Sequence, residues 1–216
     1  KVYISPPSHA WYYPGAAPMT LKMLFSSEDG RLLGAQIIGT EGVDKRIDVF
    51  SMALQARMTV YDLEEAELAY APAYGAGNDA ANMAGFVAAN HLRGDMDIFP
   101  AEEITPDTAV LDVRTKGEFD AGHIPWATNI HVDELRERLD EAPAGAPLAV
   151  ICASGYRSYF ACRILAQNGL DVANVLGGYA AYRQYHPEET ELRADGPIDS
   201  ELKARFLFSA GAEAGQ

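Results

Sequence analysis

Positive charge, cysteine and long apolar runs are all scarce in this chain of 216 residues. There are 17 Lys and Arg against 31 Asp and Glu, which gives a formal net charge of −14. This balance argues against nucleic acid or an anionic membrane as a general partner, because both need a basic face. No apolar run approaches the roughly 20 residues of a membrane span, and no signal peptide is visible. The chain begins at Lys1 rather than at a methionine, so we expect a piece of a longer protein.

The two cysteines, Cys152 and Cys162, lie on a predicted strand–loop–helix segment, about ten residues apart. That separation disfavours a disulfide between them, and a reducing, cytoplasmic setting is the simplest interpretation. The five histidines show no metal-ligand spacing, so no metal site is expected. Gly75 and Gly77 lack the third glycine and the preceding strand of a dinucleotide fingerprint, so no complete cofactor site is expected in this chain.

A change of pattern near residues 94–106 predicts two domains and a tail, with bounds 1–95, 96–187 and 188–216. The first domain is expected to be α+β, with an antiparallel sheet and helices. Its predicted elements are strands 19–25 and 32–39 joined by a turn at Asp29 and Gly30, helix 42–57, a short helix 61–65 and a helix capped by Asp79.

The second domain alternates strands with helices, which predicts an α/β fold with a parallel, doubly wound sheet. The expected strands are 109–113, 127–130, 148–151 and 173–176, and the expected helices are 116–121, 133–139 and 158–167. The tail is polar, then weakly helical over residues 200–208, then rich in glycine and alanine.

A cysteine stands where a predicted buried strand ends and a helix begins, at residue 152. We call residues 152–157 the cysteine loop; it comprises Cys152, Ala153, Ser154, Gly155, Tyr156 and Arg157, and Ser158 follows it. Backbone N–H groups that point into such a loop, together with the helix dipole, favour a negatively charged sulfur. Gly155 supplies backbone freedom and Arg157 a fixed positive charge. We therefore expect a nucleophilic Cys152 in an anion-binding loop.

Four residues separate Cys152 from Arg157, whereas protein tyrosine phosphatases place five between theirs. The tighter ring suits a single added sulfur atom, and residues 109–182 resemble a rhodanese domain. The matching stretches are residues 111–114, residues 118–125, the cysteine loop with Ser158, and residues 175–179. The resemblance implies a ping-pong sulfurtransferase in which Cys152 carries a persulfide and Arg157 shapes the loop. A phosphatase or arsenate reductase is the alternative that the short loop disfavours.

Other polar or reactive residues of this domain are expected to be structural. Cys162 falls inside the predicted helix and is interpreted as a small buried apolar residue. His123 is expected to anchor the chain by hydrogen bonding, and Asp112 and Arg114 to be structural partners near the loop.

Residues 9–93 resemble the dimerisation domain of pyridine nucleotide-disulfide oxidoreductases, and specifically the subgroup of coenzyme A disulfide and NADH-dependent persulfide or polysulfide reductases. The stretches that carry the resemblance are residues 9–15, 33–36, 42–48, 68–72 and 82–85. It implies a homodimer in which two tyrosines reach the partner's active site near coenzyme A. By position these are Tyr12 and Tyr70, with Tyr13 and Tyr74 as second choices. Clustered aromatic residues can also serve only for packing.

Some members of that subgroup carry a rhodanese domain after the dimerisation domain, in this order. The resemblance implies a full-length protein that uses FAD and NAD(P)H to reduce a coenzyme A persulfide, polysulfide or disulfide. The expected small-molecule partners are sulfur donors such as thiosulfate, polysulfide or coenzyme A persulfide, together with thiol acceptors. The alternative function is a non-catalytic module for dimerisation and for docking of sulfur carriers.

Overall fold

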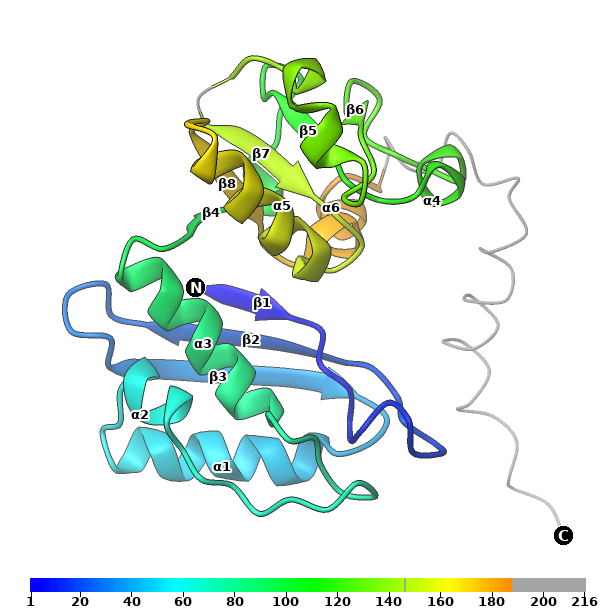
Figure 1. Cartoon of the computed structure of the whole chain (residues 1–216). Coiled ribbons are helices and arrows are strands. Elements are labelled where there is room, and N and C mark those ends of the chain that lie inside the picture. Colours follow the sequence, from blue (N-terminus) through cyan, green and yellow to red (C-terminus); the bar gives the residue numbers. More distant parts are fainter. Residues whose placement is uncertain (146, 188–216) are drawn as a thin grey trace, which may run out of the picture.

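The chain folds around two separate sheets, each with its own helices (Figure 1). The structure is a computed structural model, and it describes residues 1–145 and 147–187. The predicted tail 188–216, with its weakly helical stretch 200–208, lies outside the described residues. Within the described part, no helix is both long and apolar enough to cross a membrane.

The first unit is an antiparallel three-stranded sheet in the order β1-β2-β3, covered by helices (Figure 1). Its elements are β1 (Val2–Ile4), β2 (Met19–Phe25), β3 (Leu32–Gly39), α1 (Val43–Gln55), α2 (Val60–Glu64) and α3 (Ala80–Leu92). Both predicted strands and all three predicted helices are present. Gly30 has φ +73° in the turn between β2 and β3, a conformation that favours glycine. The strand β1 was not predicted; its place is decided by its pairing with β2, which lies further along the chain.

A buried ion pair fixes the start of α3 in the first unit. Asp79 caps this helix as expected, since its side chain accepts a hydrogen bond from the Ala81 N–H at 3.3 Å. The same carboxylate accepts from the buried Arg46 guanidinium of α1, with Nη2 at 2.8 Å from Oδ2. The pair therefore ties the segment before α3 to α1.

The second unit is a parallel five-stranded sheet in the order β4-β8-β7-β5-β6. Its strands are β4 (Asp97–Phe99), β5 (Val110–Asp112), β6 (Thr128–Asn129), β7 (Leu148–Ile151) and β8 (Val172–Val175). Its helices are α4 (Lys116–Asp120), α5 (Tyr156–Gln167) and α6 (Gly178–Tyr185), with 3-10 turns η1 (Ala101–Glu103), η2 (Leu135–Glu137) and η3 (Leu139–Glu141).

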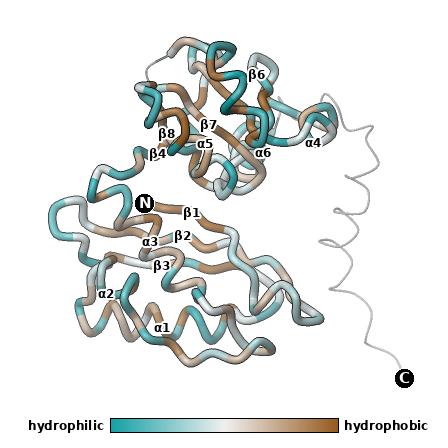
Figure 2. The backbone as a smooth tube through the Cα atoms, viewed as in Figure 1, coloured by the Kyte–Doolittle hydropathy of each residue, from teal (hydrophilic) through white to brown (hydrophobic). Residues whose placement is uncertain are grey.

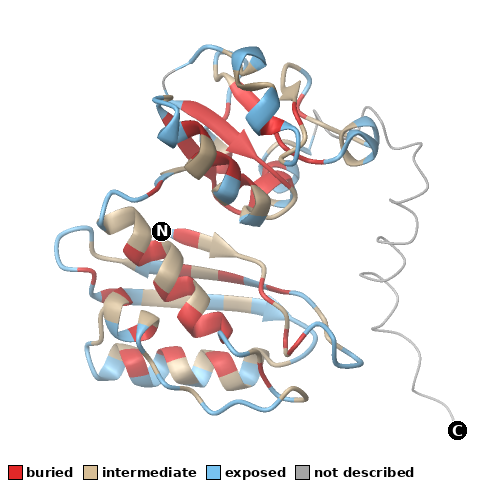
Figure 3. Cartoon of the chain, viewed as in Figure 1, coloured by how far each residue is buried: buried red, intermediate tan, exposed pale blue. Residues whose placement is uncertain are grey.

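Both faces of the second sheet are covered, as expected for a doubly wound fold. Alternate residues of β7 enter two different cores: Leu148 and Val150 pack with α5, whereas Ala149 and Ile151 pack with α6. The strand is therefore buried along its whole length (Figure 3) and reads as a continuous apolar run (Figure 2).

The predicted helix 133–139 is wrong. The chain forms two short 3-10 turns there, η2 and η3, and Leu135 is the one residue of the two turns that is buried. Apart from the partly buried Leu139, the rest of the stretch is charged, with local pairs such as the Arg138 guanidinium with Glu134 and Glu141. One buried anchor cannot fix several helical turns against the sheet, so tighter short turns form. The helix α6 was also missed, because it begins at Gly178 directly after another glycine, and glycine is a poor helix former.

The two units touch through their edges, with β1 and α3 facing α5 (Figure 1). Leu176, which follows β8 of the second sheet, is buried in the core of the first unit. Tyr3 of β1 and Tyr185 of α6 bring their hydroxyl oxygens within 3.2 Å, and Lys1 forms an ion pair with Glu102. The second unit is thus docked on the N-terminal strand of the first.

Candidate functional site

The cysteine loop closes between the end of β7 and the start of α5. Cys152 directly follows β7, and Gly155 adopts φ +99° at the start of the helix. The helix begins at Tyr156, two residues earlier than predicted, so Arg157 belongs to its first turn. In parallel sheets, ligands bind at the carboxyl ends of the strands, which is where this loop lies.

The sulfur of Cys152 has two hydrogen-bond donors beside it, and the residue is buried, at 1% exposure. The Gly155 backbone N–H donates to it at 3.2 Å, and the buried Ser158 hydroxyl lies 3.4 Å away. The same hydroxyl donates to Oδ1 of Asn174 at 2.6 Å, and the Asn174 amide donates to the Gly155 carbonyl oxygen at 3.0 Å. Donors of this kind stabilise negative charge on a sulfur.

Asn174 was missed by sequence reasoning, although it carries a signal. It is the polar residue of the otherwise apolar strand β8, and β8 pairs with β7 in parallel. A buried polar side chain needs hydrogen-bond partners. The partners of Asn174 are Gly155 of the cysteine loop and Ser158 of α5.

The first turn of α6 packs against the backbone of the cysteine loop. The N–H groups of Tyr179 and Ala180 donate to the carbonyl oxygens of Cys152 and Ala153, at 2.7 and 3.1 Å. Gly178 has φ +61°, and a Cβ on it would lie 2.5 Å from the Cys152 carbonyl oxygen. Only glycine permits this close approach of two backbones. The start of α6 is therefore a structural support of the loop.

Arg157 is clamped by a carboxylate. Its guanidinium donates to both oxygens of Glu118, at 2.8 and 2.6 Å, in a bidentate pair. The hydrogen bonds from Arg157 lower the pKa of Glu118 to about 2, and Glu118 in turn raises the pKa of Arg157, with Cys152 adding to that rise. The positive charge expected at the loop is therefore largely balanced by Glu118, and the pair ties α5 to α4.

The neighbouring polar residues have the structural partners that were predicted. The buried Arg114 guanidinium pairs with Asp112 at 2.6 Å, donates to the Gly122 carbonyl oxygen and lies over the Tyr179 ring. A ring nitrogen of His123 lies 2.8 Å from the Phe119 carbonyl oxygen.

Cys162 is a buried free thiol of α5, as Cys152 is a buried free thiol of the loop. Burial raises the pKa of Cys162, which keeps it protonated and unreactive. Among the described residues, no group of His, Cys, Asp and Glu could hold a metal ion.

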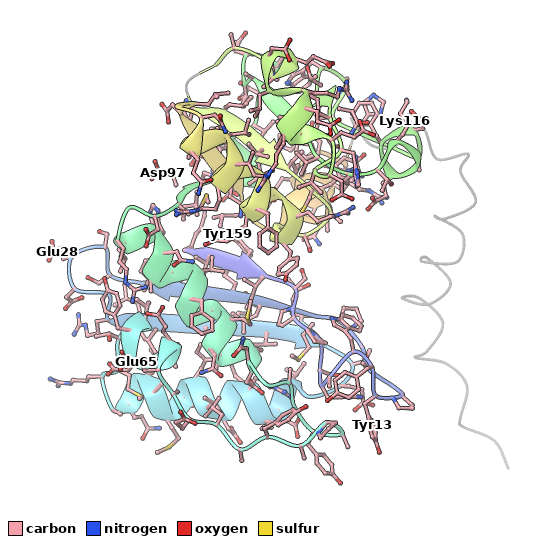
Figure 4. All side chains as sticks on the ribbon, viewed as in Figure 1. Tyr13, Glu28, Glu65, Asp97, Lys116 and Tyr159 are labelled. Atoms are coloured by element: carbon pink, nitrogen blue, oxygen red, sulfur yellow. The ribbon has the colours of Figure 1, made fainter. Side chains whose placement is uncertain are left out.

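Tyr12 and Tyr70 of the first unit meet although they lie 58 positions apart in the chain. Their hydroxyl oxygens lie 2.6 Å apart, and this hydrogen bond raises the pKa of Tyr70. Both rings are exposed, at 76% and 50%. Tyr13, labelled in Figure 4, instead packs edge-on against His9. The structure therefore brings together the first-choice tyrosines.

Comparisons with known proteins match a different protein family to each of the two units. A pyridine nucleotide-disulphide oxidoreductase dimerisation domain matches residues 1–81, and a rhodanese-like domain matches residues 100–185. A coenzyme A disulfide reductase of Staphylococcus aureus (strain bovine RF122 / ET3-1) is 45% identical over 87 residues, which are 40% of this chain and 20% of that protein.

Two solved structures cover both units. Reduced Bacillus anthracis CoADR-RHD is 40% identical with a TM-score of 0.84, over 88% of this chain and 35% of that one. A NAD-dependent persulfide reductase from A. fulgidus is 38% identical with a TM-score of 0.77, over 84% of this chain and 34% of that one. The chain spans about a fifth of the length of the curated relatives it matches. The chain therefore resembles a pyridine nucleotide-disulphide oxidoreductase dimerisation domain over residues 1–81 and a rhodanese-like domain over residues 100–185, and it aligns with part of larger proteins that include coenzyme A disulfide reductases.

Proposed function

We propose that this chain transfers sulfur through a persulfide on Cys152, as the C-terminal part of a flavin-dependent reductase of coenzyme A persulfides, polysulfides or disulfides. The observation that carries the proposal is the sulfur of Cys152 at the carboxyl end of β7, held by the Gly155 N–H and the Ser158 hydroxyl. The relatives named coenzyme A disulfide reductase and persulfide reductase support the sulfur-related redox chemistry.

The transfer has two half-reactions. The Cys152 thiolate bonds to the sulfane sulfur of a donor, the donor's bond to that sulfur breaks, and its electron pair leaves with the remaining donor anion. The product is Cys–S–S⁻, whose terminal anion the donors of the loop stabilise. An acceptor thiolate or cyanide then bonds to the outer sulfur, and the Cys152 thiolate leaves.

A phosphatase reaction is the less favoured use of this loop. Phosphate binding favours an arginine whose charge is not already paired, whereas the Arg157 guanidinium donates to both oxygens of Glu118. The four-residue spacing between Cys152 and Arg157 points the same way.

The first unit would provide dimerisation in the larger protein. We propose a homodimer in which the exposed Tyr12–Tyr70 pair faces the partner's active site near coenzyme A. FAD and NAD(P)H would bring reducing equivalents in the larger protein, and the two free cysteines fit a reducing, cytoplasmic setting. We place the domain boundary between residues 95 and 96, just before β4. Sedimentation of the chain over a wide concentration range tests dimerisation, and a monomer throughout would reject it.

The first experiment is the intact mass of the chain after brief exposure to thiosulfate or polysulfide. We expect one added sulfur atom on the wild type, removable by cyanide or by the coenzyme A thiol, and none on Cys152→Ser. Cys162→Ser is the matched control and should load like the wild type. If no donor loads Cys152, the chain is better described as a module for dimerisation and docking of sulfur carriers.

A further inference from the structure

An uncharged cleft of about 680 Å³ lies between the two units and ends at the cysteine loop. Its apolar walls come from the first unit, from the first turns of α5, and from residues in and next to β4 and β8. They include Trp11, Met83, Phe86, Tyr156, Tyr159 and Phe160. Figure 4 shows Tyr159 where α5 approaches β1 and α3. Among the described residues that line the cleft, none is Asp, Glu, Lys, Arg or His.

Two residues that line the cleft take part in the hydrogen bonds around the Cys152 sulfur. Gly155 and Asn174 both line it. The Gly155 N–H donates to the Cys152 sulfur at 3.2 Å, and Asn174 accepts from the Ser158 hydroxyl, which also lies against that sulfur. A molecule bound in the cleft would therefore lie beside the atoms that hold the nucleophile.

Several aromatic rings of the cleft are left open to solvent. Trp11, Tyr156 and Phe160 are exposed at 61%, 64% and 47%. Exposed apolar surface gathered in a concave site is typical of ligand binding rather than of folding. The rings of Tyr156 and Phe160 pack edge-to-face with centroids 5.1 Å apart, which gives the cleft a fixed aromatic wall.

We propose that this cleft holds the organic group of the sulfur donor, and that the preferred donors are monoanions whose terminal sulfur is attached to an apolar, aromatic group. The proposal rests on the sulfur transfer proposed above for Cys152. A dianion such as thiosulfate would place a second charge in a cleft without a cation to pair it, since the Arg157 guanidinium is held by Glu118.

An aryl thiosulfonate, Ar–SO₂–S⁻, belongs to this donor class. The Cys152 thiolate bonds to its terminal sulfur, the bond between that sulfur and the sulfonyl sulfur breaks, and the electron pair leaves with the sulfinate. Cys–S⁻ and Ar–SO₂–S⁻ give Cys–S–S⁻ and Ar–SO₂⁻. Charge and atoms balance without a proton, an oxidant or a reductant.

The test compares benzenethiosulfonate, methanethiosulfonate and thiosulfate as donors to the whole chain, with loading of Cys152 followed by intact mass. Each rate is corrected for the donor's reaction with a small thiol. We expect benzenethiosulfonate to load roughly tenfold to a hundredfold faster than methanethiosulfonate, because a phenyl group leaves water. Trp11→Ala and Phe160→Ala should bring that ratio toward one.

Two controls keep the result interpretable. Tyr13→Ala removes an exposed ring of the same loop as Trp11 but outside the cleft, and it should keep the wild-type ratio. The methanethiosulfonate rate of each variant reports whether the loop itself is intact. Equal loading by all donors, or a ratio unchanged in Trp11→Ala and Phe160→Ala, overturns the cleft proposal while sulfur transfer stands. No loading by any donor overturns sulfur transfer and the cleft proposal together.

Discussion

The Ser158 hydroxyl oxygen, in the first turn of α5, lies 3.4 Å from the Cys152 sulfur, and both side chains are buried. A hydroxyl has a single proton to donate, and Asn174 competes for it at 2.6 Å. We expect the shorter contact, to Asn174, to take the proton while the sulfur is neutral. When the sulfur is negatively charged, we expect the hydroxyl to donate to it instead, since charged acceptors make the stronger bond.

Replacing Ser158 tests this donor. Ser158→Ala should slow persulfide formation about tenfold or more and lower the free energy of unfolding by about 1–3 kcal/mol, because Asn174 loses a buried donor. Cyanide-dependent thiocyanate formation and urea unfolding measure the two effects. Ser51→Ala, which removes an exposed hydroxyl from α1, is the control and should change neither. Unchanged sulfur loading in Ser158→Ala would show that the hydroxyl does not serve the sulfur.

The glycine behind the loop offers a matched pair of variants. Gly178→Ala would place a Cβ against the backbone of the cysteine loop, 2.5 Å from one oxygen and 2.6 Å from the Ser154 nitrogen. Gly94→Ala meets the same backbone strain, since Gly94 has φ +75°, but nothing lies within 4 Å of its Cβ. We expect Gly94→Ala to cost about 1–2 kcal/mol and to keep sulfur transfer, whereas Gly178→Ala should cost more and reduce transfer at least tenfold. Equal transfer rates in the two folded variants would contradict the supporting role of Gly178.

The Glu118–Arg157 pair predicts an acid-sensitive part of the stability. The pKa of Glu118 falls from 4.5 to about 2 in the folded chain, so the stabilisation is complete above the unfolded value. It is then lost as the pH falls from about 4.5 toward 2. Glu118→Gln should therefore be less stable than the wild type at pH 7, by about 1 kcal/mol or less for a partly exposed pair, and the difference should close near pH 2. Urea unfolding at several pH values checks this, with Glu28→Gln as a control for the loss of one surface charge. A difference that stays constant down to pH 2 would argue against the pairing.

Leu176 couples the two units, because it directly follows β8 of the second sheet and its side chain is buried in the core of the first unit. Leu176→Ala should cost about 2–5 kcal/mol through the cavity it leaves, and it should separate one calorimetric unfolding transition into two. Leu165→Ala empties a position that belongs to the core of the second unit, so it should lower stability without separating the transitions. Two transitions already present in the wild type would mean that Leu176 does not join the units.

Strands within a local apolar stretch were predictable even when short, since β5 and β6, of three and two residues, lie inside the predicted strands 109–113 and 127–130, whereas β1 and β4 were missed. The strands over residues 19–25, 32–39 and 148–151 carry seven, eight and four residues of clear pattern. β1 and β4 have three residues each, and their partners lie in other parts of the chain. Whether such short segments form strands depends on pairing with a neighbouring strand more than on the β-propensity of their own residues.

The same distinction applies to the site. Cys152, Gly155 and Arg157 lie within six consecutive residues, so the loop they form can be recognised from the sequence. Asn174 and Gly178 come from 22 and 26 residues after Cys152, and Glu118 from 34 residues before it. Their roles depend on which strands are neighbours in the sheet, an order that a single sequence does not display.

The strand order of the second sheet also bears on how the chain is made. β2 and β3 are joined by a tight turn, so the first sheet can form as soon as it is synthesised. β4 must wait for β8, since Asp97 pairs beside Ala173, 76 residues later in the chain. During that interval the apolar strands β5 and β7 have no complete sheet to join, and non-local parallel pairing of this kind is slow. The already folded first unit then offers the second a surface against which to assemble, where β1 receives Leu176 and Tyr185.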